Sequence, residues 1–95
     1  MRTGVIATFV AKSEFEKDVE QALRKVVAPS RIDDGCEDYA LYRDPKNTLR
    51  FYMLERWEDE ESLELHQKQE HFKALLAALE GKLDELDVQT LDTLQ

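Results

Sequence analysis

The sequence predicts an α+β fold in which helices cover one face of a four-stranded antiparallel sheet. Three observations predict it. Strand and helix patterns follow one another in the order strand, helix, strand, strand, helix, strand. Apolar and polar residues alternate along the third strand, as in a sheet with one buried face. The 95 residues suffice for one domain spanning 1–95, but are near the size at which a second subunit often supplies extra burial.

The first strand and helix occupy the N-terminal third of the chain. TGVIATFVAK (residues 3–12) is rich in β-branched and aromatic residues, which favours a strand. In residues 14–31 the apolar positions repeat at helical spacing: Phe15, Val19, Ala22, Leu23, Val26 and Val27. Pro29 lacks a backbone amide, so the helix is expected to kink or end near Ser30. The Asp-Asp-Gly sequence at 33–35 then predicts a turn.

A β-hairpin is expected next, with CEDYALYR and TLRFYMLERW as strands and DPKN as the turn. One face of the second of these strands carries Leu49, Phe51, Met53, Glu55 and Trp57. The other carries Arg50, Tyr52, Leu54 and Arg56. The first face is therefore expected to pack against the helices, and the second to be mixed in polarity.

The C-terminal third predicts two short helices and a last strand. Asp59 is expected to cap the first helix, because acidic residues follow where the helix dipole favours them. A break near Lys68 precedes the second helix, whose predicted apolar stripe is Phe72, Leu75, Leu76, Leu79 and Leu83. Gly81 is expected to weaken its end, and residues 87–94 form the last strand. The complete order is that of the ferredoxin-like split βαβ fold.

Charge and composition exclude several classes of function. The chain has 13 Lys and Arg against 21 Asp and Glu, and its net charge of −8 would repel nucleic acid and anionic lipid. Neither a signal peptide nor a membrane-spanning run is recognisable, so a cytoplasmic location is expected. A single cysteine, Cys36, excludes an internal disulfide and any multi-cysteine metal site within the chain.

The uncovered face of the predicted sheet would expose apolar side chains, namely Ile6, Val10, Tyr52, Leu54 and Leu91. Packing this face against the same face of a second copy is the simplest way to bury them. The sequence therefore predicts a homodimer.

The segment 51–72 contains the candidate functional residues. An unperturbed histidine has a pKa of about 6.5, so His66 or His71 could accept a phenolic proton near neutral pH. The alternative is that His66 ends a helix and His71 is half solvated in the next. Glu55 is a carboxylate on an apolar face, so we expect it to pair with a histidine, tyrosine or arginine, in a pocket or in an ion pair near the strand end. Trp57 is large enough to be a core anchor that also walls a pocket.

Three segments, VVAPSR, GCEDYALYRD and FYMLERWEDEESLELHQKQEHF, carry a resemblance over nearly the whole chain. In this order and spacing they resemble the antibiotic biosynthesis monooxygenase family of small dimeric α+β barrels, which includes proteins named as quinol monooxygenases. The most diagnostic series is Glu55-Arg56-Trp57, followed by His66 and then His71-Phe72.

The resemblance implies a pocket between the sheet and the helices of each subunit, and oxidation of a small electron-rich aromatic or quinol-like substrate by molecular oxygen. It implies no metal, flavin or haem, because a deprotonated hydroquinone can itself give an electron to oxygen. The implied catalytic residues are His66 and His71, with Glu55. The implied substrate-binding residues are Tyr39, Phe51, Met53, Trp57 and Phe72, and His66, His71 and Trp57 are expected to border one pocket.

Two other branches of the family and one other class of protein are alternatives. Haem-degrading relatives use an asparagine and a histidine whose positions fall near Ile6 and at Leu76 here, so both ligands are missing. Isomerases of a phosphorylated autoinducer sugar share a similar pattern and would need basic residues near the pocket, for which Arg43, Arg50 and Arg56 are available. A non-catalytic dimer that binds a small molecule would keep the fold without the chemistry.

Overall fold

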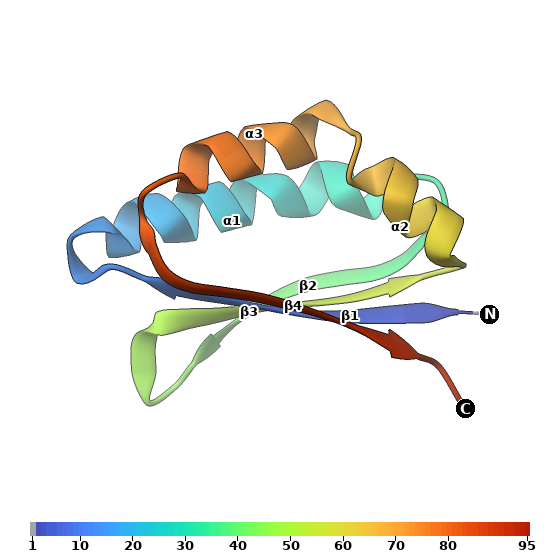
Figure 1. The fold of residues 1–95 in the computed structure, drawn as a ribbon, viewed down its shortest axis with the longest axis horizontal. Helices are drawn as coiled ribbons and strands as arrows, with labels where there is room; N and C mark the ends of the chain where they lie inside the picture. The colour runs from blue at the N-terminus through green and yellow to red at the C-terminus, as the bar shows by residue number, and fades with distance from the viewer. Residues whose placement is uncertain (1) are drawn as a thin grey trace.

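The structure is a computed structural model that describes residues 2–95 and confirms the predicted order of elements (Figure 1). The strands and helices are β1 (Thr3–Ala11), α1 (Glu16–Arg31), β2 (Cys36–Asp44), β3 (Asn47–Trp57), α2 (Glu60–His66), α3 (Glu70–Leu79) and β4 (Leu83–Asp92). A 3₁₀ turn, η1 (Ser13–Phe15), joins β1 to α1. Within residues 2–95 no helix combines the length and the apolar character needed to cross a membrane.

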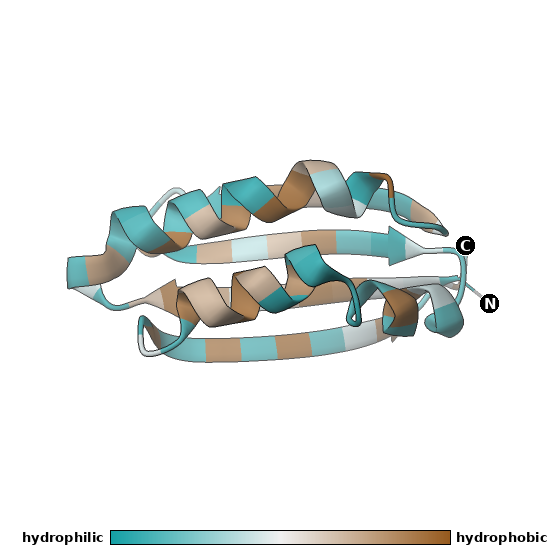
Figure 2. Cartoon of the chain, turned by 90° about the horizontal axis from the view of Figure 1, so that it is seen from above, coloured by the Kyte–Doolittle hydropathy of each residue, from teal (hydrophilic) through white to brown (hydrophobic). Residues whose placement is uncertain are grey.

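The strands form one antiparallel sheet in the order β2-β3-β1-β4, with the helices on one face (Figure 1). Seen from above, α1 lies over the β2 side of the sheet, and β4 runs along the opposite edge, beyond α3 (Figure 2). This is the predicted ferredoxin-like arrangement. Within residues 2–95 no helix lies beyond α3, so the helix-side surface of β4 is left open, and Leu86 and Val88 are 49% and 54% exposed.

The predicted alternation on β3 is confirmed. Phe51, Met53 and Trp57 face the helices and are at most 1% exposed, whereas Leu54 on the opposite face is 38% exposed. Glu55 shares the buried face and lies opposite Val5 of β1. The strand therefore places one carboxylate inside an apolar layer.

Helix α1 covers this layer with residues spaced by three and four positions: Val19, Leu23, Val26 and Ser30. Pro29 lies inside the last turn, and the helix ends at Arg31, as predicted. The hydroxyl of Ser30 is fully buried and donates to the Val26 carbonyl at 2.6 Å, so its polar group is satisfied inside the helix.

The prediction that Leu83 continues the stripe of the last helix was wrong. Helix α3 ends at Leu79, and Leu83 is the first residue of β4, which starts earlier than the predicted residue 87. Gly81 adopts a left-handed conformation, with φ of 75°, and the Lys82 amide donates to the Leu79 carbonyl at 3.0 Å. This glycine ends the helix one turn before the apolar pattern does.

The turn after α1 is held against the beginning of α2. Gly35 has φ of 80°, and a Cβ at this position would lie 2.5 Å from the Cβ of Ser62. Its carbonyl accepts from the Glu58 amide at 2.7 Å. Asp59 caps α2 as predicted, since its carboxylate accepts from the Ser62 amide at 2.8 Å. Only glycine allows both the backbone angle and the close approach.

Gly35→Ala should therefore lower the free energy of unfolding by roughly 2 kcal/mol or more, measured by urea denaturation. Gly81→Ala is the matched control, because it also has a positive φ but its new Cβ would meet nothing within 4 Å. The control should lose only the strain of the left-handed conformation, about 1–2 kcal/mol. Equal losses in the two variants would show that the contact with Ser62 adds nothing.

Candidate active site

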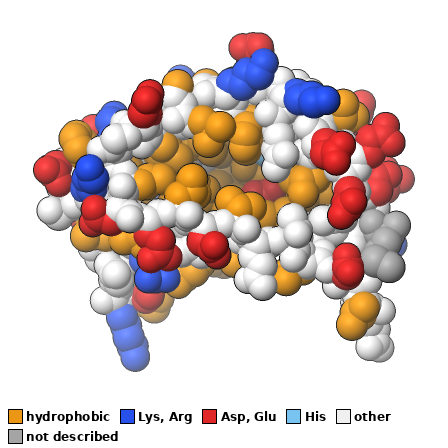
Figure 3. Space-filling view, viewed as in Figure 1, with side chains coloured by type: hydrophobic (Ala, Val, Ile, Leu, Met, Phe, Trp, Pro, Cys, Tyr) orange, Lys and Arg blue, Asp and Glu red, His pale blue; other side chains and the backbone are white. Residues whose placement is uncertain are grey.

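An apolar cavity of about 60 Å³ lies between the sheet and the short helices α2 and α3. Its lining residues are Val5, Ala7, Phe9, Tyr39, Glu55, Leu63, His66, Gln67, Phe72, Leu75, Leu76, Leu86 and Val88. Figure 3 shows hydrophobic side chains gathered around a hollow on this side of the molecule. The partly exposed Leu76, Leu86 and Val88 form its rim, because β4 has no helix above it.

His66, the last residue of α2, brings an imidazole to this cavity and is 1% exposed. Its Nδ1 lies 2.7 Å from Oδ2 of Asp33, while its Nε2 is buried and has no hydrogen-bond partner among the described residues 2–95. The ring packs on Trp57, with 4.7 Å between ring centroids, and meets Phe72 in an edge-to-face arrangement with 5.2 Å between centroids. These contacts and the hydrogen bond to Asp33 restrict the orientation of the imidazole.

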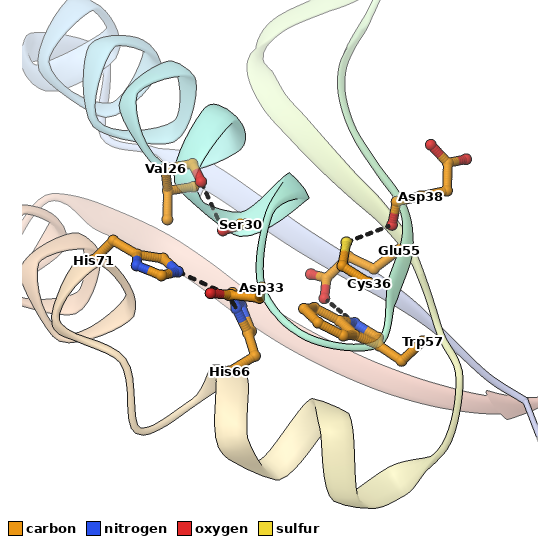
Figure 4. A network of polar contacts seen from close by, with 9 residues as sticks. All are labelled: Val26, Ser30, Asp33, Cys36, Asp38, Glu55, Trp57, His66 and His71. Atoms are coloured by element: carbon orange, nitrogen blue, oxygen red, sulfur yellow. Dashed lines mark hydrogen bonds and ion pairs between the residues drawn. The ribbon is translucent and has the colours of Figure 1, made fainter.

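Asp33 holds both histidines. Its Oδ2 also lies 2.8 Å from Nε2 of His71, in the first turn of α3 (Figure 4). The carboxylate comes from the turn after α1 and is 10% exposed, so three separate segments meet at one oxygen atom. The ligating atoms of these three side chains all lie within 4.8 Å of one another, which also makes them a group that could hold a metal ion.

The hydrogen bonds to Asp33 determine the tautomer of His66. An ionised carboxylate only accepts hydrogen bonds, so the Nδ1 of a neutral His66 carries the proton and Nε2 keeps its lone pair. Burial lowers the pKa of His66, while the neighbouring Asp33 carboxylate raises it. The effect of burial is the larger, so the pKa lies below the ordinary histidine value. This favours the neutral imidazole, which has an unpaired acceptor in the buried interior.

Glu55 is the second titratable group of the cavity. Burial raises its pKa to about 7, and the indole Nε1–H of Trp57, which donates at 2.9 Å, opposes the rise. The predicted histidine, tyrosine or arginine partner was wrong, since within residues 2–95 the side-chain hydrogen bond of Glu55 comes from Trp57. A carboxyl group with a pKa of about 7 exists in both protonation states near neutral pH.

The predicted substrate-binding residues divide into two groups. Tyr39 and Phe72 line the cavity, and burial raises the pKa of the Tyr39 phenol, so its hydroxyl stays protonated. Phe51 lies beneath the guanidinium of Arg43, 5.0 Å from its ring centroid, and lines a separate groove beside α1. Met53 is 1% exposed and is not on the cavity wall.

The predicted pocket of His66, His71 and Trp57 is formed only in part. The three rings cluster on the helix side of the sheet, but only His66 lines the cavity. Trp57 packs against the imidazole of His66, and its indole Nε1–H donates a hydrogen bond to Glu55. His71 lies on the far side of Asp33 and borders a groove between α1 and α3.

The sequence interpretation missed Asp33, because the Asp-Asp-Gly segment reads as ordinary turn chemistry. The available signal was His71, a second histidine that the mechanism did not need. Two neighbouring imidazoles in a partly buried cluster require an acceptor between them, which would have directed attention to a carboxylate such as Asp33. Cys36 is excluded as a nucleophile near neutral pH, since burial raises the pKa of its thiol to about 11.

Comparisons with known proteins agree with one another. The family model for antibiotic biosynthesis monooxygenases matches residues 3–78. A Bacillus subtilis protein named "Putative monooxygenase YcnE" is 29% identical over 66 residues, which are 70% of each chain. The crystal structure of PA3566 from Pseudomonas aeruginosa is 36% identical with a TM-score of 0.94, and the match covers 99% of this chain and 95% of that one. A crystal structure described as an antibiotic biosynthesis monooxygenase is 28% identical, with a TM-score of 0.90 and coverage of 98% and 99%.

The pKa of Glu55 makes stability depend on pH. The folded state holds the proton up to about pH 7, whereas the unfolded chain releases it near the ordinary value of 4.5. Stability should therefore fall as pH rises through this window. Glu55→Gln removes the charge and should be more stable than the native chain by about 3 kcal/mol at pH 8, with little difference at pH 4.5.

Urea denaturation at several pH values measures this effect, with Glu64→Gln on the exposed side of α2 as the matched control. His66 contributes equally to the native protein and to the Glu55→Gln variant. Because its pKa is lowered in the folded state, both lose stability as pH falls below the ordinary histidine value. If the free energies of unfolding of Glu55→Gln and the native chain differed by the same amount at every pH, the raised pKa of Glu55 would be contradicted.

Proposed function

The chain belongs to the antibiotic biosynthesis monooxygenase family, and we propose that it oxidises a small electron-rich aromatic of the quinol type with molecular oxygen. The observation that carries the proposal is the free Nε2 of His66, an unpaired acceptor buried beside an apolar cavity. A general base must be within reach of the proton it removes and must have a pKa near the working pH.

The reaction begins with the transfer of the substrate's ring hydroxyl proton to Nε2 of His66. The phenolate gives one electron to oxygen, and the semiquinone and superoxide combine at a ring carbon. His66 returns the proton to the resulting peroxide. Loss of water then leaves a hydroxylated quinone, so one oxygen atom stays on the ring, the other leaves as water, and all electrons come from the substrate. No metal, flavin or haem is needed.

Glu55 is assigned the role of accepting the second proton, the one on the ring carbon that carries the peroxide. This carbon must lose its hydrogen when water leaves, and the Glu55 carboxylate lies on the same cavity wall as His66. A pKa of about 7 makes Glu55 a base that is regenerated near neutral pH. Asp33 and His71 are positioning residues. Asp33 accepts a hydrogen bond from Nδ1–H of His66 and so leaves Nε2 free, and His71 contacts the same Asp33 oxygen.

Substrate entry requires the rim of the cavity to open. An engineered cavity of roughly 150 Å³ accommodates benzene, so the enclosed 60 Å³ here holds only part of a ring. The rim residues Leu76, Leu86 and Val88 are about half exposed, so their side chains are the ones whose rotation would open the cavity. The apolar walls then favour a ring over a charged ligand.

The isomerase alternative receives less support. Arg43 forms an ion pair with Glu20 beside α1, and Arg50 approaches Glu85 at 4.0 Å. Arg56 lies on the exposed face of β3. None of the three lines the cavity, so a sugar phosphate bound beside His66 would have no guanidinium partner from these positions.

We also propose that the protein is a cytoplasmic homodimer, joined through the sheet face away from the helices. In the single chain, Leu54 and Leu91 on this face are 38% and 39% exposed, and Ile6 and Val10 are only partly buried. Burial of this apolar surface against a second copy would remove it from water.

Oxygen uptake with a panel of hydroquinones tests the activity. His66→Gln should lower kcat by about 100-fold or more, as expected for loss of a general base. Asp33→Asn should cause a similar loss, since an amide can donate to Nδ1 and move the proton to Nε2. Lys68→Ala, an exposed change two residues from His66, is the matched control and should keep full activity. Normal turnover by His66→Gln, or turnover of a sugar phosphate without oxygen, would refute the proposal.

Light scattering at micromolar concentration tests the dimer. The native chain should have twice the mass of one chain, and Leu54→Arg should shift it to the monomer by placing a charge in the interface. Leu94→Arg is the control, because Leu94 is 92% exposed near the C-terminus. A monomeric native chain would leave the proposed interface without support.

A further inference from the structure

The side chains of Asp33, His66 and His71 converge from the turn after α1, the end of α2 and the beginning of α3 (Figure 4). The proposed reaction needs one imidazole and one carboxylate, so the second imidazole is in excess of its requirements. We propose that these three residues form a binding site for a divalent transition-metal ion of the zinc class. The ion is not a cofactor of the reaction. It would bind to the same side chains that orient the proposed base, His66.

The donor set selects the class of metal. Two imidazole nitrogens and one carboxylate oxygen are a common three-residue set for zinc, with the fourth position left to water. Magnesium and calcium prefer oxygen ligands throughout, so two nitrogen donors disfavour them. The net charge of −8 attracts cations of either kind, but the nitrogen donors decide between them.

The geometry is close to that of a bound ion. Both ring nitrogens point at Oδ2 of Asp33, at 2.7 and 2.8 Å. Tetrahedral ligands at zinc bond lengths of about 2.0–2.1 Å are separated by roughly 3.4 Å. The ligand atoms of the three side chains all lie within 4.8 Å of one another. Binding requires Oδ2 to recede by roughly 0.6–0.7 Å from each nitrogen and the two ring nitrogens to lie roughly 3.4 Å apart, and the protons between these atoms must leave. Rotations of the Asp33 and His71 side chains, which are 10% and 21% exposed, would supply these movements.

The site can be reached from solvent without entering the cavity. The side chain of His71 is 21% exposed and borders a groove of about 180 Å³ between α1 and α3. The groove wall is mostly apolar and carries one lysine, Lys25. The fourth, water-filled ligand position would face this groove.

Occupation of the site would switch off the base, a consequence that rests on the proposed function. A metal ion on Nδ1 of His66 moves the ring proton to Nε2. The nitrogen at the cavity then donates a hydrogen bond and can no longer accept the substrate proton. Metal binding and turnover should therefore exclude each other.

Isothermal titration calorimetry of the metal-free full-length chain with Zn²⁺ tests the site. One ion should bind per chain, and Co²⁺ should give the intense visible absorption of a four-coordinate complex. His71→Ala and Asp33→Asn should each weaken Zn²⁺ binding by more than the 10–100-fold typical of an outer-shell partner. Glu70→Gln removes an exposed carboxylate next to His71 and should bind normally. The chain has two histidines, so surface histidines cannot imitate the result.

Zn²⁺ should also raise the Tm of the native chain but not that of His71→Ala, whose fold is checked by circular dichroism. The absence of Zn²⁺ binding, or equal binding by the native chain and both site variants, would overturn the proposal. Zn²⁺ binding without oxygen uptake on any hydroquinone would leave the site in place and refute the proposed function. Inhibition by Zn²⁺ that a chelator reverses would support both.

Discussion

One largely buried carboxylate oxygen joins the turn after α1 to the two short helices α2 and α3. Helices α2 and α3 have 7 and 10 residues, too few to be stable alone, and both meet the turn after α1 through Oδ2 of Asp33. A carboxylate with 10% exposure must be satisfied by hydrogen bonds, and two imidazoles satisfy it. The same contacts give His66 its tautomer. The junction of α2 and α3 with the turn after α1 and the tautomer of the candidate base thus depend on the same atom.

Much of the fold could be predicted, because it follows from local periodicity. Alternation along β3 identified Phe51, Met53 and Trp57 as core and marked Glu55 as the exceptional residue. The error at Leu83 arose because an apolar pattern continued past Gly81, whose left-handed conformation stopped the helix. Periodicity records which face of an element is apolar, but it does not record where the backbone turns.

The site was harder to predict, because it depends on contacts between distant segments. Asp33 is 33 positions from His66, and no local pattern links a turn to the end of a later helix. The partner of Glu55 was nearer: Trp57 is two residues along the same strand face, and the alternation already placed the two side by side. Phe51 and Met53 share that face as well, but the cavity runs along β1 and β4. Its wall includes Ala7 and Phe9, the β1 residues paired with Met53 and Phe51, rather than Met53 and Phe51 themselves.

The rim of the cavity has a consequence for how such a chain can change over evolutionary time. The groups that would do the chemistry come from the interior of the molecule, whereas Leu76, Leu86 and Val88 stand at the open edge and are 46%, 49% and 54% exposed. Substitutions there cost little stability, because few neighbours depend on them. Ligand preference can therefore drift by mutation at the edge while the interior is inherited unchanged. One scaffold can in this way give rise to many specificities without first losing its fold.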